Sequence, residues 1–133
     1  MEWKYVKKVN NVDDISAFES IAGYRLCESF KDCILKSNGG RPSKKCFLTD
    51  KNREIELKSL LSINRDDKET LWDAIHWLDE GDSEKYVPFA TDNFGNLICF
   101  DKESDGVVFY DHEDASTEMV ASDFDMFIDG LYE

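Results

Sequence analysis

The chain has 133 residues, of which 41% are hydrophobic and 13% aromatic. This composition is typical of one globular domain over residues 1–133, and no low-complexity or Pro-rich segment indicates disorder. Its formal net charge of −13 at pH 7 disfavours direct binding to the phosphate backbone of nucleic acids. No stretch approaches the ~18 apolar residues of a membrane span and the N-terminus lacks a signal-peptide pattern, so we expect a cytoplasmic protein without a membrane partner.

The acidic residues are concentrated in the second half of the chain. Residues 1–60 carry 12 Lys and Arg against 9 Asp and Glu, residues 61–100 carry 3 against 9, and residues 101–133 carry Lys102 against 11 acids. An acidic surface favours a basic protein as partner. The alternative interpretation is that the acids only keep the protein soluble and monodisperse.

Two helices are predicted in the first third of the chain. Asn and Asp residues at positions 10–14 precede apolar residues at helical spacing, and Gly23 supplies the C-terminal cap of this first helix. The second helix is expected from about Glu28 to Ser37, because the following Asn and two Gly residues tolerate a left-handed backbone. The basic segment 41–45 follows a helix and lacks the spacing of a phosphate-binding loop, so a surface loop is preferred.

An antiparallel pair of strands is expected at residues 46–49 and 54–58. The second of these runs alternates charged and apolar residues with a period of two, which predicts one wet face and one buried face. We expect this pair to extend the sheet formed further along the chain.

A third helix is predicted to open at Asp66 and to end near Gly81. The segment Asp66-Asp67-Lys68-Glu69 is typical of a capping box, and Leu71, Ile75 and Leu78 form an apolar stripe after it. His76 lies in this amphipathic segment, where a packed or surface histidine is preferred over a catalytic one.

The segment 86–112 predicts a three-stranded antiparallel meander around which the rest of the chain packs. Its three apolar runs are separated by polar segments with Gly and Asn, which supply the backbone conformations of tight reversals. Pro88 cannot donate a ladder hydrogen bond, so its strand is expected at a sheet edge or with a bulge. The runs 97–100 and 107–110 are almost continuously apolar and should be buried on both faces.

A last helix closes the domain in this interpretation. Ser122, with Asp125 three residues on, is predicted to cap it, and apolar residues repeat at helical spacing from Phe124 to Leu131. The predicted fold class is α+β, with a mostly antiparallel sheet of about five or six strands and about four helices around it.

The sequence offers little for catalysis, a cofactor or a metal. The four cysteines are Cys27, Cys33, Cys46 and Cys99. They lie in apolar or amphipathic segments, where we expect reduced core thiols. No two of them have the spacing of a pair of zinc ligands. No nucleophile elbow or metalloprotease motif occurs, so no enzyme and no cofactor are predicted. The segment Asp111-His112-Glu113-Asp114 admits a metal or acid–base site, but an exposed loop is preferred.

The order of several short motifs resembles the SUKH superfamily, which includes bacterial immunity proteins and fungal regulators of cell-wall synthesis. The resemblance covers about Trp3 to Leu131. It is carried by an N-terminal Trp region, Phe18-Glu19 before Gly23, Leu26, Asn38-Gly39-Gly40, Val87-Pro88-Phe89-Ala90, Asp92 with Gly95-Asn96, Ile98-Cys99-Phe100-Asp101, Val108 to His112 and a Phe-rich last helix.

This resemblance implies a non-enzymatic cytoplasmic immunity protein that binds and blocks the toxin domain of a polymorphic toxin, often a nuclease. A basic nuclease surface would pair with exposed acids near strand ends and loops. The predicted partner-binding residues are Asp79, Glu80, Asp82, Glu84, Asp105, Asp111, Glu113 and Asp114. The alternatives are a regulatory scaffold without a toxin partner and, less favoured, an enzyme or ligand-binding domain that uses the Asp111–Asp114 cluster.

Overall fold

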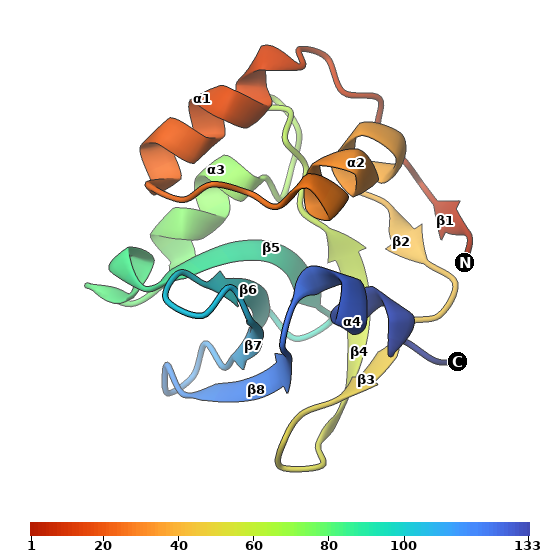
Figure 1. The fold of residues 1–133 in the computed structure, drawn as a ribbon, viewed down its shortest axis with the longest axis vertical. Coiled ribbons are helices and arrows are strands. Elements are labelled where there is room, and N and C mark those ends of the chain that lie inside the picture. Colours follow the sequence, from red (N-terminus) through yellow and green to blue (C-terminus); the bar gives the residue numbers. More distant parts are fainter.

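The computed structural model describes residues 1–133 and shows an α+β fold in which helices lie against a curved antiparallel sheet (Figure 1). In chain order the elements are β1 (Trp3–Lys4), α1 (Asp13–Ala22), α2 (Glu28–Ser37), β2 (Arg41–Pro42), β3 (Cys46–Leu48), β4 (Glu54–Leu60), α3 (Leu71–Ala74), the 3₁₀ turns η1 (Ile75–Trp77) and η2 (Asp82–Glu84), β5 (Tyr86–Asp92), β6 (Leu97–Asp101), β7 (Val107–Tyr110), β8 (Thr117–Ala121) and α4 (Phe124–Asp129). No helix is long and apolar enough to cross a membrane.

The main sheet has six strands in the order β3-β4-β5-β6-β7-β8, and every neighbouring pair is antiparallel. The predicted fold class, the meander and its extension by β3 and β4 are therefore confirmed. The sequence analysis missed β8, which pairs with β7, and the small sheet of β1 and β2. Both β1 and β2 are two residues long, which is too short for a period-two pattern to stand out.

Pro88 lies in a central strand because β5 pairs with β4 on one side and β6 on the other. The prediction of an edge strand is wrong, and the alternative of a bulge is confirmed by a register shift between Pro88 and Ala90. The bulge leaves Phe89, the residue after Pro88, without a partner in β6, while Pro88 itself is paired with Cys99.

Strands β6 and β7 are buried on both faces, as predicted. One face contributes Ile98, Phe100, Val107 and Phe109 to a core of 24 buried residues. Four residues on the other face and Leu78, which lies between η1 and η2, form a smaller cluster of five buried residues. The η1–η2 segment thus covers part of the second face of the sheet.

The main core joins the helices to the sheet through aromatic rings. Phe30 of α2 lies 5.4 Å from Phe89, 5.1 Å from Phe100 and 5.2 Å from Phe124 between ring centroids, all with edge-to-face geometry. Such pairs add to the free energy gained from burial. Phe30 therefore links α2, β5, β6 and α4 at one point.

The third helix is much shorter than predicted. Helix α3 begins at Leu71 after Thr70, whose side chain accepts a hydrogen bond from the Asp73 amide, and it continues only into η1. The expected opening at Asp66 is wrong because the neighbouring Asp67 accepts hydrogen bonds from Ser62 and Asn64, which holds residues 62–67 in a turn.

The other three helices lie where they were predicted, and only the cap of α4 differs. Helix α2 has the predicted bounds, and Gly23 ends α1 in the left-handed conformation with φ of 66°. Asp123, and not Ser122, caps α4 by accepting a hydrogen bond from the Met126 amide.

All four cysteines are free thiols. The expectation of core cysteines is wrong for Cys27, which is exposed in the linker between α1 and α2.

Candidate partner-binding surfaces

The eight predicted acidic residues lie at three places in the fold. Four lie between η1 and β5, Asp105 lies in the turn before β7, and Asp111, Glu113 and Asp114 lie in the turn after β7. Since Asp105 and Asp111 flank opposite ends of one strand, the eight residues do not form one continuous surface. Six of them are exposed, while Asp82 and Asp111 are half-buried.

Tyr110 ties the first group to the end of β7. Its hydroxyl donates to Asp82 Oδ2 at 2.7 Å and accepts a hydrogen bond from the Asp79 amide at 3.0 Å. Burial, followed by the hydrogen bond to Asp82, raises the pKa of Tyr110 to about 12. Asp82 therefore has a structural role. Through Tyr110, the first group is joined to the end of β7, where the β7–β8 turn begins.

The three glutamates among the predicted acids have side chains that are free for a partner. Glu80, Glu84 and Glu113 are exposed, and no hydrogen bond or ion pair engages their carboxylates. Exposed carboxylates of this kind attract a basic protein at long range with little desolvation cost.

The segment Asp111–Asp114 forms a turn and not an assembled site. The Asp111 and Asp114 carboxylates accept hydrogen bonds from the amides of Glu113 and Ser116, and hydrogen bonding from Ser116 lowers the pKa of Asp114. The His112 ring points to Asn96, with Nδ1 2.7 Å from Oδ1. No group of three or more His, Cys, Asp and Glu side chains in the chain is placed to hold a metal ion.

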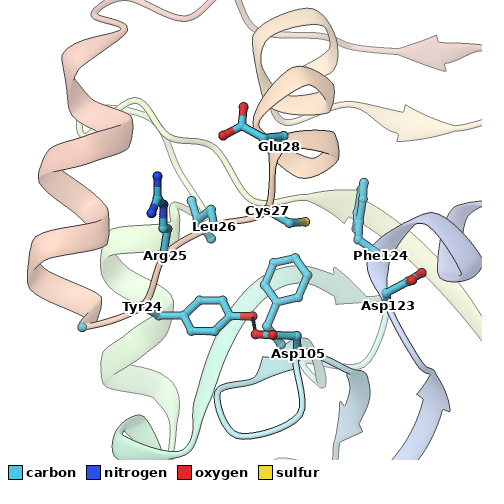
Figure 2. A pocket seen from close by; sticks show the side chains of 10 residues that line it. Tyr24, Arg25, Leu26, Cys27, Glu28, Asp105, Asp123 and Phe124 are labelled. Atoms are coloured by element: carbon cyan, nitrogen blue, oxygen red, sulfur yellow. Dashed lines mark hydrogen bonds between the residues drawn. The ribbon is translucent and has the colours of Figure 1, made fainter.

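A groove of about 640 Å³ opens where the α1–α2 linker, the β6–β7 turn and the start of α4 meet (Figure 2). Its lining residues are Gly23, Tyr24, Arg25, Leu26, Cys27, Glu28, Phe100, Asp105, Asp123 and Phe124. The left-handed Gly23 turns the chain out of α1 and so sends the linker along the groove.

Tyr24 forms one wall of this groove. Its hydroxyl donates to Asp105 Oδ1 at 2.7 Å, and its ring stacks on Phe100 with centroids 5.9 Å apart. Burial and the hydrogen bond to Asp105 raise the pKa of Tyr24 well above its ordinary value. The hydroxyl therefore remains a neutral donor that fixes the position of the Asp105 carboxylate.

Only Asp105 among the groove residues was predicted as a site residue. Gly23 signals a chain reversal after α1, but nothing local shows that residues 105 and 123 lie beside that reversal. The exposed thiol of Cys27 was also missed, because its neighbour Leu26 is buried and the pair reads as apolar.

These features define an α+β protein with exposed acidic groups and an open groove between the α1–α2 linker and α4. Residues 10–130 match the model of the SMI1 / KNR4 family (SUKH-1), so the chain belongs to this family, and the resemblance found in the sequence is confirmed. No curated protein matches the chain significantly. Membership supports an immunity-type or regulatory role at the level of the family, whose members are generally not enzymes.

Proposed function

We propose that this protein is a cytoplasmic immunity protein that binds and blocks the toxin domain, a nuclease, of a polymorphic toxin system. The family match over residues 10–130 is the observation that carries the proposal. The net charge of −13 supports it, since a nuclease that binds a phosphate backbone presents basic side chains to an inhibitor.

The free carboxylates of Glu80, Glu84 and Glu113 are proposed to steer this encounter. They lie on the η1–η2 segment and the β7–β8 turn, which Tyr110 holds together. Asp79, Asp82, Asp111 and Asp114 contribute charge to the same surface while their backbone or side-chain hydrogen bonds keep it in shape. Asp105 belongs to the groove at the other end of β7.

The test is a binding titration with the inactivated toxin domain encoded beside this gene. At low salt we expect tight one-to-one binding that weakens as salt is added, because exposed charges are screened. Tight binding that is insensitive to salt would retain the immunity function and move the interface to apolar residues. Absence of binding to a folded toxin domain would favour the alternative, a regulatory scaffold of the same family.

A charge-reversal variant tests the acidic surface directly. Changing Glu80, Glu84 and Glu113 to Lys should lower the association rate about ten-fold or more at low salt. The matched control changes Asp32, Asp66 and Asp129 to Lys, since these exposed acids have no side-chain hydrogen bond and lie outside the predicted surface. Equal rates for the two variants would show that only net charge, and not this surface, matters.

A further inference from the structure

The groove of Figure 2 has an excess of negative charge that the protein itself does not neutralise. Asp105 and Asp123 line it, against the single positive charge of Arg25, while the third acid of the lining, Glu28, is paired with Lys31. No ion pair within the protein engages Arg25, Asp105 or Asp123, and Figure 2 shows Arg25 directed away from the two aspartates. The side of the groove near Asp105 and Asp123 is therefore an unpaired anionic site.

Each of these two aspartates keeps one carboxylate oxygen free. Asp105 Oδ1 accepts the Tyr24 hydroxyl, and Asp123 Oδ1 accepts the Met126 amide at 2.8 Å, while the Oδ2 atoms have no hydrogen-bond partner. Since the occupied oxygens fix both side chains, the free oxygens are held in place before any ligand arrives. Preorganised acceptors of this kind suit an ammonium or guanidinium group.

The apolar part of the groove suits the stem of a long basic side chain. The half-buried ring of Tyr24 stacks on Phe100 and supplies this apolar surface, since Phe100 and Phe124 are themselves buried. The methylene groups of Lys or Arg pack on apolar surface, and their cationic ends are attracted to aromatic faces.

We propose that this groove receives a basic segment of the partner, in which Lys or Arg side chains pair with the free oxygens of Asp105 and Asp123 and pack against the ring of Tyr24. This inference rests on the proposed function and names a contact that the acidic surface at the other end of β7 does not include. The groove thus provides a specific anchor, whereas Glu80, Glu84 and Glu113 attract the partner from a distance.

Two isosteric substitutions, D105N and D123N, remove the charge and retain the structure. Asp105 has φ of 62°, which Asn tolerates, and the amide oxygen introduced by D105N can still accept the Tyr24 hydroxyl; Asn also caps a helix as well as Asp does. Binding of the inactivated toxin domain to D105N/D123N should weaken about ten-fold or more. The control D32N/D129N removes the same charge from exposed positions outside the groove and should bind like the wild-type protein.

The thiol of Cys27 provides a second measurement that needs no substitution. Cys27 is the exposed cysteine, whereas Cys46 and Cys99 are buried and Cys33 is half-buried. Iodoacetamide should alkylate Cys27 in the free protein, and a bound toxin domain should slow this alkylation about ten-fold or more, as followed by peptide mass spectrometry. The half-buried Cys33 serves as the internal reference outside the groove.

The outcomes separate this inference from the proposed function. If the wild-type protein binds the toxin domain while Cys27 stays reactive and D105N/D123N binds like D32N/D129N, the groove inference is overturned and the immunity function stands. If the wild-type protein does not bind the toxin domain, both are overturned. Weakened binding of D105N/D123N together with protection of Cys27 establishes the groove as the anchor.

Discussion

At the scale of single residues, Glu118 is the buried acid that connects distant parts of the sheet. Its side chain on β8 accepts hydrogen bonds from Thr49, at 2.7 Å, and from Arg53, both near the β3–β4 turn. Burial alone would raise the pKa of Glu118, but the bonds from Thr49 and Arg53 and the charge of Arg53 outweigh burial and lower the pKa. Glu118 therefore stabilises the folded protein in its ionised form.

Replacing Glu118 with Gln should reduce the free energy of unfolding by about 1–3 kcal/mol at pH 7, because the charge-assisted bond to Arg53 is lost. Because the folded-state pKa is below the ordinary value of 4.5, the folded state binds fewer protons. The stabilisation is thus present above the unfolded-state pKa and is lost as the pH falls through the folded-state pKa.

Urea unfolding at pH 7 and at about pH 4 measures both the loss of stability and its dependence on pH. The difference between wild-type protein and E118Q should shrink at the lower pH. E113Q is the matched control, since Glu113 is exposed and without a partner, and it should change stability by less than about 0.5 kcal/mol. A difference that stays constant between the two pH values would contradict the prediction.

At the scale of elements, helix caps decide where short helices begin. Helix α4 has only six residues, Phe124–Asp129, and its first turn depends on the Asp123 side chain. The sequence favoured Ser122 because Ser followed three residues later by an acid is typical of a capping box. The structure directs the Ser122 hydroxyl to the Met126 sulfur instead.

Substitution by Ala distinguishes the two caps. D123A should lower the free energy of unfolding by about 1 kcal/mol, since an amide of α4 loses its acceptor. S122A should change it by less than about 0.5 kcal/mol, because the hydroxyl of this exposed residue caps no amide. Thermal or urea unfolding of both variants measures the difference, and a larger loss for S122A would show that the predicted cap was the correct one.

At the scale of the whole molecule, the sheet curls so that the β3–β4 turn meets β8. The Asp50 amide donates to the Met119 carbonyl at 2.8 Å, in addition to the contacts that Thr49 and Arg53 make with Glu118. This curvature encloses the main core between the sheet and the helices (Figure 1). It also leaves the acid-rich turns after η1 and β7 exposed on the outside.

Repulsion among these acids should make the stability depend on salt. With a net charge of −13, raising NaCl from about 20 to about 200 mM should increase Tm by about 2–5 °C, because screening weakens repulsion in the folded state. The variant with Glu80, Glu84 and Glu113 changed to Lys is less negative, since each change raises the net charge by two, and its Tm should increase less with salt. Calorimetry of both proteins checks this, and a Tm that falls with salt would mean that internal ion pairs dominate.

The sequence by itself determined the elements whose signals are local. The apolar runs of β6 and β7, the alternation in β4, and the helix between Glu28 and Ser37 with its Gly-rich end all depend on residues close together in the chain. The same is true of the charge asymmetry and of the order of motifs that identified the family. Local periodicity and capping chemistry are sufficient for such features.

The tertiary structure alone decided which side chains meet. Tyr24, Asp105 and Asp123 form one groove although they come from opposite ends of the chain, and Glu118 is buried only because Arg53 and Thr49 reach it from another hairpin. Pro88, next to a bulge, lies in a central strand because β4 pairs with its strand on the side opposite β6. These contacts depend on how strands pair and how the sheet curves, and no local pattern of residues specifies either.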